Sequence, residues 1–553
     1  MTSAFERTST SGGFSRRGFL GLSFASLGAF ALAACSTGGT SVGAGGTVED
    51  IRALLPDYNP FTLAEPAFPS VDGSTAGFTE WPKPLADGTT RKPGNGSTFT
   101  AIAAVYSIIP PSVDSNSYYQ ALNDAIGARI ELQPSDSGEY EAKLQAVLAS
   151  PRDVPDWVVI PSSLALPRFD QAVDALFEDL TPFLAGDAVE DYPNLANITT
   201  DTWRYCVFNG KLMALPFPAE LIGSQMYFRL DIFEELGLAQ PTNADELFDV
   251  AQALTDPGAG RWGVNDIFEN GLDQVFRIPQ TFSYSGGELL GRLETEEYRL
   301  AIEFLQRLVD AGVVHPNAAA ANGNPKERFE AGQVGITVDG LGGWRSATRR
   351  FAPVNPDYHQ AAAVPFAHDG GEPVVWKANP ANMNSFIKKS DDKERIKEQL
   401  RIADWLASPF GSKEWVLANF GVEGEHWDPD PATGAPVSNE NGLKFLSAGY
   451  RYLASPNTVD ATVAYPGYVE EFTTWMKNAV KYVKEGDFWG QRILEPARFN
   501  SLKTLTDDFE ADVLGGRATA ADLDRVIENW RSQGGDELRD FYADAAETLG
   551  IQQ

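Results

Sequence analysis

The four histidines of this chain are the first side chains to test as metal ligands or general bases. None has another histidine four residues away and no cysteine lies near any of them: they are His315, His359, His368 and His426. Zinc sites require clustered nitrogen and sulfur ligands. The histidines therefore give no support to a zinc site, and we expect no metal and no cofactor.

Two glycine patterns match catalytic or cofactor motifs but stand in the wrong context. Gly258, Gly260 and Gly263 fit G-x-G-x-x-G, yet they follow a helical pattern and a proline instead of a strand, so a dinucleotide site is not indicated. Residues 39–43 fit G-x-S-x-G but lie in a run of small residues that cannot strain a serine. We therefore expect a protein that is not an enzyme.

Aromatic side chains are the more informative group. The chain has 12 Trp, 17 Tyr and 33 Phe, and their indole and phenol groups offer flat apolar faces with polar edges. Sugars present apolar C–H faces ringed by hydroxyls, so a cleft rich in such rings would suit a carbohydrate. The alternative for each ring is packing in a core, where large aromatic side chains are mostly buried.

The formal net charge of -32 argues against two classes of partner. Phosphate backbones and anionic lipid surfaces would repel so acidic a chain, so we expect no nucleic acid partner. At 43% hydrophobic and 22% charged residues, the composition is that of a globular protein with material for two or three domains. We expect it to be a monomer.

The N-terminus has the pattern of an export signal. Ser15-Arg16-Arg17-Gly18 precedes an uncharged stretch that ends in Leu32-Ala33-Ala34-Cys35, which resembles a twin-arginine signal with a bacterial lipobox. We predict a signal peptide over residues 1–34 and a lipid on Cys35 that anchors the protein to the extracellular face of the cell membrane. An uncleaved anchor is the alternative, but the stretch is short for a bilayer core of about 30 Å. Gly21 stands where Lys is common, which leaves the general secretion route open.

Residues 35–97 are predicted to connect the lipid to the folded body. Ten of the twelve residues 36–47 are Gly, Ser or Thr, a composition typical of a flexible tether. Seven prolines between Pro56 and Pro93, with no sustained period, predict an extended segment over 48–97.

Short apolar runs alternate with helical patterns from Phe99 onward. FTAIAAVY, ARIEL and DWVVIP are predicted strands without polar alternation, and SYYQALNDAIG and EYEAKLQAVLAS are the predicted helices between them. This order predicts an α/β fold with a parallel sheet covered on both faces, and residues 466–553 are predicted to be largely helical. Ligands of such sheets bind beyond the carboxyl ends of the strands, which makes three side chains candidates for binding: Asn116, Tyr118 and Ser162.

Several segments, taken in order, resemble the extracellular solute-binding protein family 1 of ABC importers, especially its long LipO-like lipoprotein branch. They are NGKLMALP from Asn209, YFRLDIFEELGLAQPTNADELFDVAQAL from Tyr227, FEAGQVGI from Phe329 followed by Gly342-Gly343-Trp344, DDKERIKEQLRIADWLASPFGSKEW from Asp391, FGVEGEHW from Phe420 and DFEADVLGGRATAADLDRVIENW from Asp508. Long members often carry a calcium loop where this chain has residues 255–263 with one carboxylate. Because calcium takes six to eight oxygens, we predict no metal there.

The resemblance implies a type II periplasmic-binding-protein-like fold. Two α/β lobes, each a sheet flanked by helices, would hold the solute in the cleft between them, and hinge closure would enclose it. By this analogy the first lobe comprises 97–220 plus 374–450, and the second comprises 221–373 plus 451–553.

The same resemblance suggests binding residues. A Trp at the turn that matches Trp344 stacks on sugar in similar family members, although packing is an equal alternative for it. Glu220 and Arg229 could hydrogen-bond hydroxyls or a uronic carboxylate, while Arg229 could equally pair with Asp231. The weaker aromatic candidates are Trp262, Tyr284, Trp376 and Trp427.

The implied function is a non-catalytic receptor that captures a carbohydrate, which we expect to be an oligosaccharide, for an ABC permease. The ATPase must be a separate polypeptide, because the chain has no G-x-x-x-x-G-K-[ST] motif. One alternative is a receptor for peptides or another small solute. The other is a surface-anchored glycoside hydrolase, which would need two carboxylates at a set separation.

Overall fold

The computed structural model describes residues 48–106, 109–164, 166, 169–320, 324–491, 493 and 495–551. All of them belong to one unit of the chain, residues 40–553, and the other unit is residues 1–39. The predicted signal peptide, Cys35 and the small-residue tether therefore lie outside the described residues.

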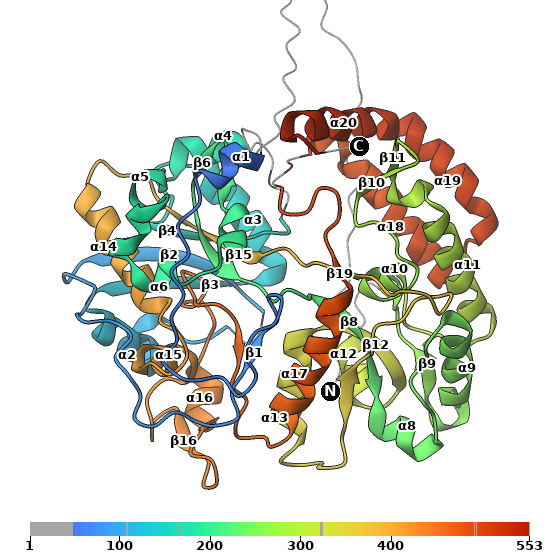
Figure 1. The fold of residues 1–553 in the computed structure, drawn as a ribbon, viewed down its shortest axis with the longest axis horizontal. Helices are drawn as coiled ribbons and strands as arrows, with labels where there is room; N and C mark the ends of the chain where they lie inside the picture. The colour runs from blue at the N-terminus through green and yellow to red at the C-terminus, as the bar shows by residue number, and fades with distance from the viewer. Residues whose placement is uncertain are drawn as a thin grey trace, which may run out of the picture. The chain divides into compact units, whose positions relative to one another are not determined.

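Five strands form the first sheet, in the order β3-β2-β4-β15-β7 (Figure 1). The first three are parallel, as predicted, whereas β15 is antiparallel to both of its neighbours. Every residue of β4 is buried, which is why its sequence WVVIP shows no polar alternation. The bounds are β2 Thr98–Val105, β3 Arg129–Asp136, β4 Trp157–Pro161, β7 Leu215–Pro218 and β15 Ala381–Ile387.

Five of the helices around this sheet, α2, α3, α14, α15 and α16, begin at a side chain that accepts a hydrogen bond from the first turn. The Asn116 side chain accepts a hydrogen bond from the Tyr119 N–H at 3.2 Å at the start of α2, and Gly127 ends that helix in the left-handed conformation. The helices are α2 Ser117–Ile126, α3 Ser137–Leu148, α4 Phe169–Leu176, α5 Thr181–Leu184, α6 Pro193–Ala196, α7 Thr200–Arg204, α14 Lys393–Leu406, α15 Lys413–Phe420 and α16 Glu440–Phe445. Two small hairpins accompany them, β5 Val207–Phe208 with β6 Lys211–Leu212 and β16 Trp427–Pro429 with β17 Pro436–Ser438.

Four strands form the second sheet, in the order β13-β8-β12-β9. The strands are β8 Ser224–Arg229, β9 Trp262–Val264, β12 Val334–Gly340 and β13 Gln360–Ala362, and the hairpin β10 Phe282–Ser285 with β11 Glu288–Gly291 stands apart from them. The helices of this region are α8 Leu230–Leu236, α9 Ala244–Leu254, α10 Asp273–Val275, α11 Glu296–Asp310, α12 Pro325–Glu330, α13 Leu341–Phe351, α17 Tyr468–Ala479, α18 Asn500–Leu514, α19 Leu523–Trp530 and α20 Asp536–Leu549.

Separate hydrophobic clusters surround the two sheets. The first sheet has its own cluster, whereas the second sheet has one on each face. Tyr227 and Phe228 are neighbours on β8 and enter different clusters, because alternate side chains of a strand point to opposite faces. Phe228 packs with the C-terminal helices, and Tyr227 packs with Trp344 and α17. The lobe boundaries given above stay a prediction.

Two short segments connect the sheets and pair with each other. We call residues 219–223, between β7 and β8, and residues 377–380, before β15, the crossover strands. The Ala219 N–H donates to the Pro380 carbonyl at 3.1 Å, and the Ala378 N–H donates to the Leu221 carbonyl at 2.9 Å. Just before residue 377, β14 Val375–Trp376 pairs in parallel with β19 Val483–Lys484.

The proline-rich segment 48–97 is hydrogen-bonded along the body. It begins with α1 Val48–Arg52, and β1 Ala76–Gly77 pairs with β18 Val459–Asp460. Further on, the Gly88 N–H donates to the Glu414 carboxylate at 2.7 Å. Most of the segment lacks regular structure, in keeping with its prolines.

Candidate functional site

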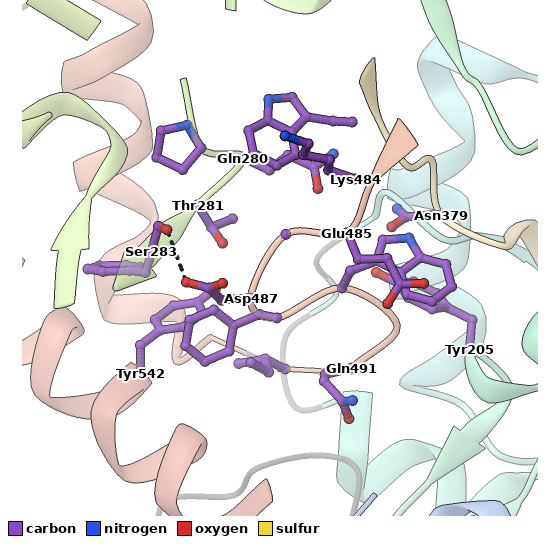
Figure 2. Close-up of a pocket in the computed structure, with 17 residues that line it drawn as sticks. Tyr205, Gln280, Thr281, Ser283, Asn379, Lys484, Glu485, Asp487, Gln491 and Tyr542 are labelled. Carbon is purple, nitrogen blue, oxygen red and sulfur yellow. Dashed lines mark hydrogen bonds between the residues drawn. The ribbon is translucent and has the colours of Figure 1, made fainter. Parts of the chain in front are cut away.

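A cavity of about 450 Å³ lies where the crossover strands meet residues 484–491 (Figure 2). We call it the aromatic cavity. Its aromatic lining comprises Tyr205, Phe282, Trp376, Phe488, Trp489 and Tyr542, and its polar lining comprises Gln280, Thr281, Ser283, Asn379, Lys484, Glu485, Asp487 and Gln491.

One wall of the aromatic cavity is fixed by Asp487. Its carboxylate accepts a hydrogen bond from the Ser283 hydroxyl at 3.0 Å, drawn in Figure 2, and another from the Tyr284 N–H at 2.8 Å. Both donors belong to β10, so the segment 484–491 is tied to that strand. The carboxylate therefore sets the distance between two parts of the lining.

The opposite wall is held by Trp489 and Lys377. The Trp489 indole N–H donates to the Ala378 carbonyl at 2.8 Å, and the Lys377 ammonium lies 3.6 Å from the centre of the same ring. Lys377 also donates to Glu485 at 2.7 Å and to Asp201 on α7 at 3.2 Å. This cation–π contact and two ion pairs hold α7, the crossover and the 484–491 segment together.

Two buried polar atoms of the lining have no hydrogen-bond partner among the residues that the structure describes. They are Nε1 of Trp376 and Oε1 of Gln491, whose residue is only 8% exposed. Leaving a buried donor or acceptor unmatched costs about 1–3 kcal/mol.

The lining as a whole has the composition of a polar-ligand site. Flat aromatic faces alternate with amide and carboxylate groups, and a few convergent polar groups among apolar walls are typical of small-molecule sites. Trp376 is the one predicted binding residue in the lining. Tyr284 adjoins the cavity through its backbone N–H.

A second, smaller cavity of about 210 Å³ borders the same crossover strands. We call it the arginine cavity. Pro218 lines it, whereas Asn379 lines the aromatic cavity, and the Ala219–Pro380 hydrogen bond lies between these two residues. The full lining is Phe217, Pro218, Arg345, Arg349, Trp415, Asn419, Phe420, Arg451, Ser455, Pro456, Asn457, Thr458, Val459, Ala461 and Thr462.

Glu220, a predicted binding residue, lies beside the arginine cavity in an ion network. Arg345 donates to Asp460 at 2.9 Å and to Glu220 at 3.2 Å, and the Asp460 side chain is completely buried. Burial raises the pKa of Glu220, and the positive charge of Arg345 opposes that rise. Glu220 is thus engaged with protein groups in this structure.

Four predicted residues belong to the region of the first sheet, and one of them, Trp427, packs with Val416 and Phe420 in a small separate cluster. Asn116 caps α2, the Tyr118 hydroxyl donates to the Ala418 carbonyl at 2.7 Å, and the Trp427 indole donates to the Gly421 carbonyl at 3.1 Å. The Ser162 hydroxyl, directly after β4, donates to the Ala381 carbonyl at 2.6 Å. The structure does not bring these four to either cavity, and their binding roles stay predictions.

Three further predicted residues belong to the region of the second sheet. Arg229 makes a two-pronged ion pair with Asp231, at 2.9 and 2.7 Å, which is the structural alternative named above. Trp262 packs edge-on against His315. Trp344 is 1% exposed and lies among aromatic side chains: Tyr227, Tyr468, Phe472 and Trp475. Their roles in binding likewise stay predictions.

The sequence profile of the bacterial extracellular solute-binding protein family matches residues 117–420, more than half of the chain. The chain belongs to this family. The family assignment and the α/β solute-binding fold predicted from sequence are thereby confirmed. As a member, the protein is a non-catalytic extracellular receptor that binds a small solute for an ABC transporter. In the part of the chain that the structure describes, no helix has the length and apolarity to cross a membrane.

Individual relatives agree with this membership. The chain is 23% identical to Lipoprotein LipO of Bacillus subtilis over 480 residues, which are 80% of this chain and 91% of LipO. It is 22% identical to the polygalacturonan/rhamnogalacturonan-binding protein YtcQ of the same organism, over 65% of this chain and 75% of YtcQ. The structure of an HMO-binding solute-binding protein of Bifidobacterium longum infantis superposes with a TM-score of 0.60 at 14% identity, covering 83% of this chain and all of the other.

Sequence reasoning missed most of the aromatic cavity. Tyr205, Asn379, Trp489 and Gln491 were not singled out, because they come from three distant segments that only the fold brings together. A signal did exist for Trp489, since Asp-Phe-Trp stands between Gly486 and Gly490 and so interrupts the helical pattern.

Proposed function

We propose that this receptor captures a carbohydrate, an oligosaccharide, in the aromatic cavity and delivers it as a monomer to a membrane permease driven by a separate ATPase. Closure of the two predicted lobes about the crossover strands would enclose the solute. The solute would shift the equilibrium toward the closed state, because it makes more contacts with the protein in that state.

The observation that carries the proposal is the pairing of indole faces with unmatched polar atoms in one cavity. Trp376 and Trp489 supply large flat apolar surfaces, and aromatic faces of this kind suit the C–H faces of sugars. The unmatched Trp376 N–H and Gln491 oxygen are a buried donor and a buried acceptor, and a closure that turned them toward the cavity would let a hydroxyl-bearing ligand pair with both.

Two relatives support a carbohydrate as the solute. YtcQ is named for binding polygalacturonan and rhamnogalacturonan, and the Bifidobacterium protein for binding HMO. The names of these two relatives therefore favour a carbohydrate as the class of solute.

Calorimetric titration of the wild-type protein tests the proposal. The panel comprises neutral oligosaccharides, oligogalacturonides and, as the competing class, short peptides. We expect binding to at least one saccharide with heat that saturates at one molecule per protein. Tight binding of a peptide with no saccharide bound would overturn the proposal in favour of a peptide receptor.

The variant Gln491→Leu gives a more specific test, because its expected effects on stability and on affinity have opposite signs. Removing the unmatched oxygen should leave the free protein as stable as before or raise its Tm, while affinity for the bound saccharide falls about fivefold or more. Gln145→Leu is a matched control, since Gln145 is on α3 and donates only to Glu141. Equal effects of both variants on affinity would count against a binding role for Gln491.

We also propose that Cys35 carries the lipid that keeps the receptor at the extracellular face of the membrane. The support is the Leu32-Ala33-Ala34-Cys35 sequence together with the similarity to a lipoprotein, LipO. The variant Cys35→Ala should lose labelling by radioactive palmitate and appear in the culture medium. Retention of the variant in the membrane fraction would refute the lipid anchor.

A further inference from the structure

The charge of the arginine cavity differs from that of the chain around it. The whole chain has 76 acidic against 44 basic side chains, yet the lining of this cavity contains three arginines and no carboxylate. The lining is therefore a local concentration of positive charge in an acidic protein, and such a concentration raises the local potential for anions.

The three arginines are not equally neutralised. Arg345 is held by Asp460 and Glu220. Within the described part of the chain, neither Arg349 nor Arg451 has a carboxylate within ion-pair distance. Arg451 donates to the Asn419 side-chain oxygen at 3.0 Å, which orients its guanidinium, and Arg349 is exposed near the Phe420 ring.

We propose that the arginine cavity receives an ionised carboxylate of the solute, so that the saccharide bound by this receptor contains uronic acid. This inference rests on the proposed carbohydrate function and specifies the class of sugar. The planar guanidinium of Arg451 can donate two parallel hydrogen bonds to a carboxylate, the arrangement that makes such pairs strong and specific.

A carboxylate fits this cavity better than a phosphate does. The acidic Asp460 and Glu220 lie directly behind Arg345, so the excess positive charge is small and suits one negative charge more than two. The half-buried rings of Phe217 and Trp415 provide apolar surface for a sugar ring next to the guanidinium.

The position in the fold also suits a solute site. Phe217 and Pro218 form the carboxyl end of β7, and Arg345 lies in the first turns of α13, directly after β12. Ligands of open α/β sheets bind beyond the carboxyl ends of strands. The cavity thus lies between the carboxyl-terminal edges of the two sheets.

The experiment compares trigalacturonate with the same trisaccharide after its carboxyl groups are reduced to hydroxymethyl groups. Calorimetry on the full-length wild-type protein should give at least tenfold tighter binding of the charged form. The variant Arg451→Gln should lower affinity for trigalacturonate about tenfold or more and leave the reduced form unaffected. Arg525→Gln on α19 removes the same charge from outside both cavities and should change neither.

Several outcomes would overturn the inference. Equal affinity of the wild-type protein for the two trisaccharides would do so while leaving carbohydrate binding intact, whereas binding of no saccharide at all would refute the proposed function itself. Stronger binding of a hexose 6-phosphate than of trigalacturonate would show that the arginine cavity binds a phosphate and not a carboxylate. If Arg451→Gln does not fold, Arg349→Gln tests the same charge at the rim, and an unchanged preference in that variant would contradict the inference.

Discussion

The two cavities beside the crossover strands solve the problem of buried polar groups in different ways. In the aromatic cavity Lys377 pairs with Glu485 and Asp201, and the Asp487 carboxylate accepts two hydrogen bonds. Two neutral polar atoms of its lining have no partner among the described residues. In the arginine cavity the buried charge of Arg345 is matched by two carboxylates, and two further guanidinium groups face the space without a carboxylate.

This difference indicates what each cavity can select. Neutral unmatched atoms favour hydroxyl groups. Hydrogen bonds to hydroxyl groups are individually weak, and their strength depends little on salt concentration. Guanidinium groups favour anions, and their attraction depends on ionic strength and on the charge state of neighbouring acids. Hydroxyl groups and carboxylates are therefore the two kinds of group that the cavities would select, and uronic-acid oligosaccharides carry both.

The largest expected effect concerns the buried network of the arginine cavity. The variant Arg345→Met leaves Asp460 buried without its cation and removes the partner of Glu220. Breaking a buried ion pair from one side costs about 3–5 kcal/mol, so we expect a loss of that size in the free energy of unfolding, measured by urea denaturation. Arg349→Met, from an exposed position, is the matched control. A loss below about 1 kcal/mol would show that this network does not stabilise the fold.

In the aromatic cavity the largest effect should come from an indole. The variant Trp376→Ala removes both a flat face and the unmatched N–H, so we expect affinity for the saccharide to fall about tenfold to a hundredfold. Trp376→Phe keeps an aromatic face and should lose only a few-fold. Calorimetry measures both, and equal losses would place the contribution in the N–H group and not in stacking.

Some parts of the fold and of the site could be predicted from the sequence, and others could not. Unbroken apolar runs such as WVVIP revealed parallel strands, because strands buried on both faces need no polar residues. The antiparallel strand β15 was not predicted, since it comes from a segment more than 200 residues after β4 and local pattern says nothing about partners. Asn116, which was predicted to bind the solute, caps α2, and in sequence an Asn that follows a strand looks the same in either role.

The residues proposed to bind the solute depend on contacts between distant segments. Trp376 was selected for its type alone, as Trp427 was, whereas the resemblance to the family favoured Trp344; the fold buries Trp344 and Trp427. Arg451 and Arg349 could not be selected, because what distinguishes them is that no carboxylate of the described residues lies within ion-pair distance of them. The sequence, with its 76 acidic residues, does not show which arginines have no carboxylate beside them in the fold.

Salt should separate the two cavities. Raising sodium chloride from about 0.05 M to about 0.5 M shortens the screening length severalfold, so affinity for trigalacturonate should fall several-fold. Affinity for its carboxyl-reduced form should change by less than twofold, since that ligand relies on hydroxyl groups and ring faces. If the affinities of both ligands fell equally with salt, the electrostatic attraction would come from the protein surface in general and not from the arginine cavity.

The smallest expected effect is a dependence of uronate affinity on pH through Glu220. Burial raises the pKa of this carboxyl above its ordinary value of 4.5, against the opposing charge of Arg345. As the pH falls from neutrality through that raised pKa, Glu220 takes up a proton and no longer neutralises Arg345, so the cavity becomes more positive. A uronic carboxyl, with a pKa of about 3.5, stays ionised, and we expect its affinity to rise a few-fold.

The variant Glu220→Gln should bind trigalacturonate at neutral pH as tightly as the wild type does in acid, with no rise on acidification. The raised pKa of Glu220 affects the stability of the fold in the same direction. Because the folded protein holds this proton more tightly than the unfolded chain, the contribution of Glu220 to stability is largest below about pH 4.5 and declines as the pH rises through the raised pKa. Calorimetric titrations and urea denaturation over this range measure the two trends, and a wild-type affinity that falls on acidification would exclude Glu220 as the controlling group.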